Sequence, residues 1–84
     1  MAGLSRFDVQ PNPFSNYIEV NIELEQSLDL QIRITDITGK TIKQQKIVNQ
    51  SIFNTRFDLS TLGSGVYIVE LETKDGIVSQ RIVK

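Results

Sequence analysis

The chain contains no cysteine, no histidine and no tryptophan among its 84 residues. Without cysteine there can be no disulfide, no thiolate metal ligand and no thiol nucleophile. Without histidine the chain also lacks the commonest general base and the commonest metal-binding side chain. Its serine and threonine hydroxyls therefore have no imidazole to activate them as nucleophiles. These absences argue against an enzyme and predict a protein that uses no metal or other cofactor.

Aromatic residues and net charge are also scarce. Four phenylalanines and two tyrosines are too few to build a flat platform for sugars or bases. Nine basic and ten acidic side chains leave a net charge of −1, and the basic residues are spread along the chain. Nucleic-acid binding needs a basic stripe, so nucleic acid is not an expected partner. No apolar run approaches the roughly 18 residues of a transmembrane helix.

The length of the chain allows one domain with a thin core, because domains of this size bury only about 60% of the surface that the unfolded chain exposes. Met1-Ala2-Gly3 has no charged region followed by an apolar stretch, so it does not read as a signal peptide. We interpret residues 1–3 as a cloning remnant and residues 4–84 as a domain cut from a larger protein.

Apolar residues recur mainly with a period of two, which is typical of half-buried strands. Residues 18–24 and 28–35 both alternate in this way, and the polar Glu25-Gln26-Ser27 between them is predicted to be a loop. Residues 40–48 have a polar, lysine-bearing middle that predicts an edge strand. Residues 66–73 begin with apolar side chains on both faces, which predicts a central strand.

Turn residues separate these segments. Asp36-Ile37-Thr38-Gly39 predicts a tight turn in which Asp36 accepts a main-chain hydrogen bond and Gly39 takes a positive φ. Asn49-Gln50-Ser51 predicts a second turn, and Lys74-Asp75-Gly76 contains the Asp-Gly pair of two-residue hairpins. Together with short strands near Phe7, Phe53 to Leu59 and Ile77 to Lys84, these signals predict an all-β antiparallel sandwich of about seven strands.

Two stretches carry more than these signals require. Pro11-Asn12-Pro13-Phe14 is unusually rigid for a strand connection, although a corner between two sheets would explain it. The second stretch is Gly65-Val66-Tyr67 with the terminal Gln80-Arg81-Ile82-Val83-Lys84. A core tyrosine on a central strand and an edge strand with basic flanks would explain it. A final strand that reaches the last residue also leaves that end exposed for recognition. Glu19 and Glu23 share a polar face, but a solvated face accounts for them without a metal.

Four of these segments, in this order, resemble the type A C-terminal sorting domain of the type IX secretion system of Bacteroidetes. The similarity covers residues 7–84 and rests on a proline box, a strand–turn–strand segment, a leucine and small-residue loop followed by Gly-Val-Tyr, and a closing hairpin with a basic end: residues 9–14, 34–40, 59–69, and Asp75-Gly76 with residues 81–84.

The resemblance implies an immunoglobulin-like β-sandwich of about seven strands. It also implies a non-catalytic secretion signal that directs a cargo protein from the periplasm across the outer membrane, to the cell surface or the medium. The expected partners are the type IX translocon, its shuttle proteins and a sortase-like peptidase. The cargo domain that would precede the signal is absent from this chain.

The resemblance assigns roles to two sets of residues. The candidates for direct recognition are Arg81, Ile82, Val83 and Lys84. The motif residues for which we expect a structural role are Pro11, Asn12, Pro13, Gly39, Gly65, Val66, Tyr67 and Gly76.

The alternative hypothesis is a generic β-sandwich accessory, carbohydrate-binding or adhesion module of a secreted protein. The scarcity of aromatics argues against sugar binding. An enzyme is the third and least favoured class. In either β-sandwich, free edge strands predict weak self-association.

Overall fold

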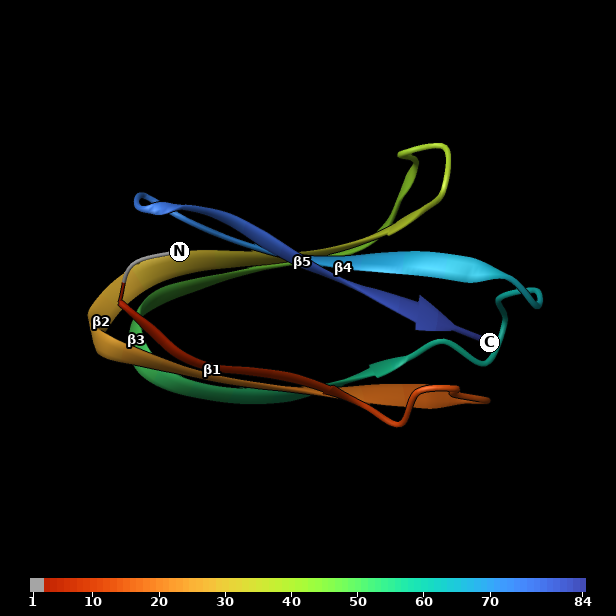
Figure 1. Ribbon diagram of the computed structural model, residues 1–84, viewed down its shortest axis with the longest axis horizontal. Helices are drawn as coiled ribbons and strands as arrows, with labels where there is room; N and C mark the ends of the chain where they lie inside the picture. The colour runs from red at the N-terminus through yellow and green to blue at the C-terminus, as the bar shows by residue number, and fades with distance from the viewer. Residues whose placement is uncertain (1–2) are drawn as a thin grey trace.

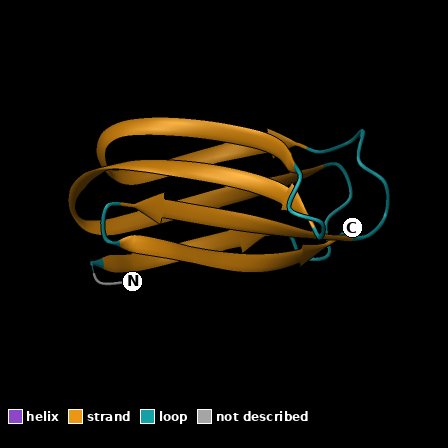
Figure 2. Ribbon diagram, turned by 90° about the horizontal axis from the view of Figure 1, so that it is seen from above, coloured by secondary structure: helices purple, strands orange, loops and turns teal. Residues whose placement is uncertain are grey.

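The computed structural model describes residues 3–84, which form β-strands and turns without a helix (Figures 1 and 2). The strands are β1 (Leu4–Gln10), β2 (Tyr17–Asp36), β3 (Thr41–Asp58), β4 (Val66–Thr73) and β5 (Gly76–Val83). Every pair of neighbours is antiparallel, in the order β1-β2-β4-β5, with β3 paired to β2. The predicted all-β antiparallel class is confirmed. Nothing in the described range could cross a membrane as a helix.

The two long strands contribute to both layers of the sandwich because each bends part of the way along its length (Figure 1). In one layer, residues 17–23 of β2 lie between β1 and residues 52–58 of β3. In the other, residues 31–36 of β2 lie between the first half of β3 and β4, which also pairs with β5. One side of the sandwich is therefore bounded by the bent β3, and the other by β1 and β5.

The structure corrects the predicted number of strands from about seven to five. Residues 25–27 and 49–51, interpreted as connections, lie inside β2 and β3. The ladder shifts register between Glu23 and Leu30, and Asn49 has a φ of 53°. Such irregularities bend a strand while the pairing resumes beyond them. The polar composition of these segments reflects exposure at the bend and does not mark the end of a strand.

Alternation along the strands directs apolar side chains into the space between the two layers. The side chains with no exposed surface come from both layers, and one of them lies on the terminal strand β5. They are Ile18, Val20, Ile22, Ile32, Ile34, Leu59, Val69, Leu71 and Ile82. Because the chain has no cysteine, no disulfide supports this core, and burial of apolar surface at about 25 cal/mol per Å² is its main stabilising contribution.

The first residues of the chain and the β4–β5 hairpin bear on two expectations from the sequence. Met1 and Ala2, two of the residues interpreted as a cloning remnant, lie outside the described residues. The carbonyl oxygen of Gly3 accepts a hydrogen bond from the N–H of Glu25 at 2.8 Å. In the β4–β5 hairpin, Gly76 pairs with Thr73. The turn therefore consists of Lys74 and Asp75, one residue earlier than the Asp-Gly pair suggested.

The β2–β3 turn forms as predicted around Asp36. Its Oδ1 accepts hydrogen bonds from the Thr38 hydroxyl at 2.6 Å and from the N–H groups of Thr38 and Lys40 at 2.9 and 3.0 Å. Gly39 takes a φ of 91° and donates its N–H to the Asp36 carbonyl oxygen at 3.1 Å. The Thr38 hydroxyl, followed by the two N–H donors, lowers the pKa of Asp36.

We predict that the charge on Asp36 stabilises the fold at neutral pH and that this contribution is lost in acid. The carboxylate has a lowered folded-state pKa, so its stabilisation is present above the unfolded value of about 3.9 and disappears as the pH falls through the folded pKa. Asp36→Asn keeps an oxygen acceptor but removes the charge. Urea unfolding of both proteins should show a difference at neutral pH that shrinks in acid; a difference independent of pH would contradict the prediction.

Candidate functional site

Three segments that are far apart in the sequence meet at one end of the sandwich (Figure 1). They are residues 11–14, the loop of residues 59–65 and residues 81–84, and we call them together the carboxyl-end cluster. Hydrogen bonds join both of the first two segments to the last one. The start of β1 lies at the opposite end of the molecule (Figures 1 and 2). The motifs singled out from the sequence are therefore brought together around the end of β5.

Asn12 contacts the outer edge of β5 as a neighbouring strand would. Its Nδ2 donates to the carbonyl oxygen of Arg81 at 3.2 Å, and its Oδ1 accepts the N–H of Val83 at 3.0 Å. The N–H of Phe14 then donates to the carbonyl oxygen of Val83 at 2.9 Å. The peptide bonds before Pro11 and Pro13 are both cis. The proline box is thus one structural unit with the terminal strand.

Lys84 is held by both its main chain and its side chain. Its N–H donates to the carbonyl oxygen of Gly65 at 2.9 Å, and its own carbonyl oxygen accepts the N–H of Gly65 at 3.1 Å. Its Nζ donates to the carbonyl oxygens of Leu59, Ser60 and Leu62 at 2.9, 3.2 and 2.7 Å. An ammonium group has three donor protons, so these carbonyls can use all of them.

The loop that receives Lys84 is also fixed from its other side. Asp58 Oδ1 accepts the N–H of Ser60 at 3.0 Å, and Leu59 is fully buried with its N–H bonded to the carbonyl oxygen of Asn16 at 2.8 Å. Hydrogen bonds from the Ser60 side chain and main chain lower the pKa of Asp58, with smaller contributions from the charges of Lys43 and Lys84. A carboxylate and an ammonium group therefore hold one short loop between them.

Gly65 and Tyr67 connect this loop to the central strand. Gly65 has a φ of 155°, a value that residues with a side chain rarely adopt. The space where a Cβ would lie is open. Tyr67 is buried, as expected, and its hydroxyl donates to the carbonyl oxygen of Gly63 at 2.7 Å. Its ring meets the ring of Phe14 edge to face, with centroids 6.1 Å apart. Val66, between the two motif residues, is half-buried.

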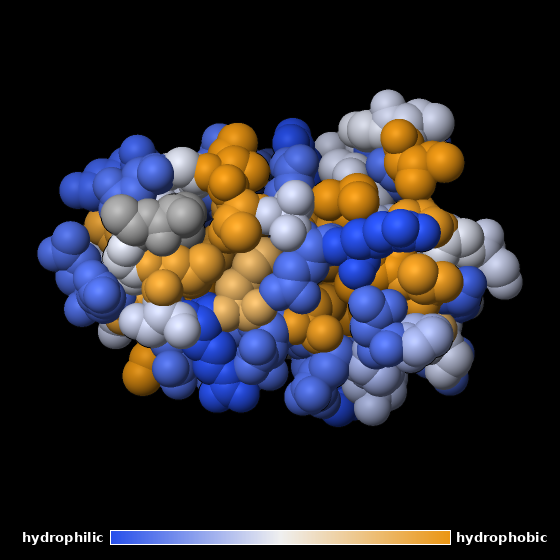
Figure 3. All heavy atoms as spheres, in the orientation of Figure 1, coloured by the Kyte–Doolittle hydropathy of each residue, from blue (hydrophilic) through white to orange (hydrophobic). Residues whose placement is uncertain are grey.

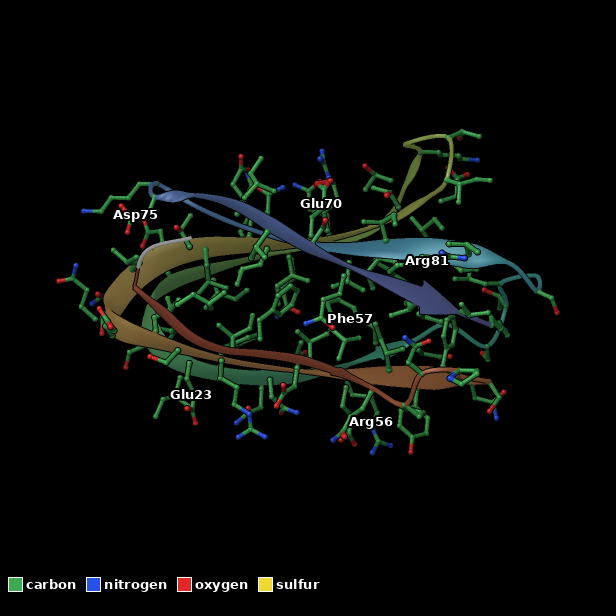
Figure 4. All side chains as sticks on the ribbon, viewed as in Figure 1. Glu23, Arg56, Phe57, Glu70, Asp75 and Arg81 are labelled. Carbon is green, nitrogen blue, oxygen red and sulfur yellow. The ribbon has the colours of Figure 1, made fainter. Side chains whose placement is uncertain are left out.

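The four residues expected to be recognised differ in exposure. Ile82 has no exposed surface and belongs to the core, whereas Val83 is 37% exposed. Arg81 is exposed on β5, and its side chain forms no ion pair within residues 3–84 (Figure 4). Lys84 is half-buried because its ammonium group binds the loop. The side chains that another protein could touch directly are those of Arg81 and Val83.

The remaining motif glycines lie elsewhere. Gly39 is in the β2–β3 turn, and Gly76 begins β5 at the hairpin far from the carboxyl-end cluster. No role was predicted for Asp58 or Gln80, yet Asp58 caps the loop and the Gln80 side chain donates to the carbonyl oxygen of Phe7. For Asp58 a signal was available, because an Asp at the start of a turn commonly accepts the main-chain N–H two residues further on.

The outer face of β1, β2 and β3 is polar and carries several ion pairs. Arg56 and Glu23 point outward there, whereas Phe57 points into the core (Figure 4). Glu19 pairs with Arg56 at 2.5 Å and Glu23 lies 3.9 Å from Arg6, so arginines face the carboxylates that were considered as a metal pair. No acidic cluster suited to a metal occurs in residues 3–84.

A shallow, mainly apolar groove of about 380 Å³ opens on the surface of the sandwich. It lies between β2, β3 and β4 and is lined by Leu30, Ile47, Val48 and Thr73, among others. This groove is far from the carboxyl-end cluster. None of the four segments that carry the family resemblance contributes to it.

Fold and site together define an all-β domain whose terminal strand is held by residues 11–14 and by the loop of residues 59–65. The chain belongs to the family described as the secretion system C-terminal sorting domain, whose model matches residues 8–84. None of the curated proteins compared with the chain matches it. This family provides the C-terminal sorting signal of type IX secretion in Bacteroidetes, which carries proteins across the outer membrane to the cell surface or the medium.

We predict that Lys84→Met lowers the free energy of unfolding by about 1–3 kcal/mol, because the variant keeps the aliphatic stem but leaves partly buried carbonyls without their donor. The matched control is Arg81→Met, which removes an exposed charge without a partner and should change stability by less than about 0.5 kcal/mol. Urea unfolding followed by circular dichroism measures both. Equal effects of the two substitutions would show that the Lys84 contacts contribute nothing.

Proposed function

We propose that the type IX machinery recognises the exposed side of the carboxyl-end cluster, and that the buried side of the cluster holds the recognised residues in place. The proposal is supported by the division within the terminal segment. Arg81 and Val83 expose their side chains, whereas Ile82 fills the core and Lys84 binds the loop of residues 59–65. Recognition residues and anchoring residues alternate along one strand, as the period of two requires.

In this proposal, residues 4–84 are a non-catalytic unit whose partners are the translocon, its shuttle proteins and a sortase-like peptidase. A structural role for Asn12, Gly65 and Tyr67 is supported by their contacts with the terminal strand and its loop. A chain without cysteine or histidine is suited to such a role, because an address signal needs shape and exposed side chains but no reactive group. The carbohydrate-binding alternative has no supporting observation.

The export role of Arg81 has a direct test. A periplasmic reporter fused to residues 4–84 is expressed in a Bacteroidetes strain with a working type IX system. Arg81→Glu should reduce export of the reporter by at least about tenfold, equivalent to roughly 1.4 kcal/mol of lost binding. The reason is that the substitution reverses an exposed charge beside Val83 without removing any contact within the domain.

Lys46→Glu is the matched control for this experiment, since it makes the same charge reversal on the exposed part of β3. We expect the control to be exported normally and both variants to melt within a few degrees of the unchanged domain. Normal export of Arg81→Glu would contradict a recognition role for Arg81. Export that simply follows the melting temperature of each variant would indicate that the terminal segment acts only as scaffold.

We also propose weak self-association through the outer edge of β3, which has no partner strand beyond β2 among the described residues. Lys43 and Lys46 repel a second copy there, and this repulsion keeps the pairing weak. Light scattering should detect a monomer in dilute solution and a larger mass at protein concentrations on the order of 1 mM. Association should increase at high salt, which screens the lysine charges. A monomer under all these conditions would disprove the proposal.

A further inference from the structure

The outer edge of β5 has a defined pattern of main-chain groups. Gly65 and Lys84 exchange two hydrogen bonds, which makes them a hydrogen-bonded antiparallel pair. Because bonded and non-bonded pairs alternate, Val78 and Gln80 also bond to β4. Ile77, Ser79, Arg81 and Val83 must therefore direct their N–H and C=O groups away from β4, toward the outer edge.

Part of this edge is already occupied by the domain itself. Asn12 bonds to the carbonyl oxygen of Arg81 and the N–H of Val83, and Phe14 bonds to the carbonyl oxygen of Val83. The contact between residues 11–14 and the edge of β5 ends at Arg81. Within residues 3–84, no hydrogen bond reaches the N–H of Arg81 or the main-chain groups of Ser79 and Ile77. An open stretch of edge therefore continues directly from a covered one.

The open stretch also lacks the charges that usually protect sheet edges. Ile77-Val78-Ser79-Gln80 carries none and Arg81 alone is charged at its end, whereas β3 has Lys43 and Lys46 and β1 has Arg6 and Asp8. Charged residues on edge strands discourage pairing with other chains, and their absence leaves this stretch competent to pair. The Ile77 side chain is 58% exposed beside it.

The surface next to the open stretch is apolar. Leu4, Val9 and Val78 are partly buried and pack against the core at the side of the sandwich where β1 and β5 are outermost. Figure 3 shows apolar atoms on this face, interrupted by polar ones. The Gln80 side chain crosses between the layers to the carbonyl oxygen of Phe7. A strand placed along β5 would therefore find main-chain partners on its edge and apolar contacts beneath it.

We propose that an extended, uncharged segment of a partner protein, with apolar side chains at alternate positions, adds as a strand to β5 at Ile77–Arg81. It continues the line of hydrogen bonds that Asn12 and Phe14 begin, and its apolar side chains cover Val78 and Ile77. This mode of binding is strand addition to a sheet edge, in which main-chain hydrogen bonds supply much of the affinity. The proposal rests on the sorting function, because the partner belongs to the export machinery.

Two substitutions test the edge in the reporter fusion described above. Ser79→Pro removes the outward N–H of Ser79 without touching the ladder to β4, and proline is tolerated where an edge N–H faces solvent. Ile77→Lys places a charge on the open stretch. Each should reduce export by at least about tenfold, equivalent to roughly 1.4 kcal/mol of lost binding.

The matched controls are Ser79→Ala, which keeps the N–H, and Ile52→Lys, which adds the same charge at an equally exposed isoleucine (61%) on β3. Both should be exported within about twofold of the unchanged fusion, a difference of less than roughly 0.5 kcal/mol. Melting temperatures check folding, and if Ser79→Pro melts low, the comparison of Ile77→Lys with Ile52→Lys decides.

Normal export of both edge variants, with the unchanged fusion also exported, would overturn strand addition and leave the sorting function intact. Retention of the unchanged fusion in the periplasm would instead refute the sorting function and this proposal with it. A photo-crosslinking amino acid at position 77 distinguishes a partner protein from a second copy of this chain on the edge. An adduct of two copies of the fusion would assign the edge to a second copy of this chain and overturn the proposal.

Discussion

The structure depends on how the last residues of the chain are fixed. A terminal strand would ordinarily fray, because it has neighbours on one edge only and its last residues are tied down by little. Here β4 pairs with one edge of β5, and Asn12 and Phe14 bond to the other edge at Arg81 and Val83. Ile82 fills the core between the layers, and Lys84 closes the arrangement by binding the loop that precedes β4.

This arrangement suits a small domain without cross-links. Burial is limited in a chain of this length, so the fold relies on long strands that serve both layers and on the Asn12 side chain, which bonds to the edge of β5 as a strand would. Among the family motif residues, Asn12 makes this replacement, whereas Gly39 and Gly76 lie away from the carboxyl-end cluster. In the function proposed above, the domain presents a partly exposed strand. Its specificity then comes from Arg81 and Val83, the terminal side chains that remain exposed while Ile82 and Lys84 hold the strand in place.

Sequence periodicity predicted the antiparallel class, the β2–β3 turn and the central position of β4, because each of these follows from local alternation or turn chemistry. The number of strands could not be predicted in the same way. Polar residues at a bend, such as those around Asn49, resemble a loop when only their composition is known. The contacts of Asn12 and Lys84 were also invisible, since their partners are main-chain groups many residues away and carry no side-chain signature.

The most direct test of this account is native-state hydrogen exchange of the main-chain amides near the carboxyl end. The N–H groups of Val83 and Lys84 are bonded to Asn12 and Gly65, so we predict that they exchange as slowly as that of Leu71 in the core. The outward N–H of Ser79, which has no partner within residues 3–84, should exchange much faster. If Val83 and Lys84 exchange as fast as Ser79, the end of the chain is frayed and the claim that it is held as a rigid, presented strand is wrong.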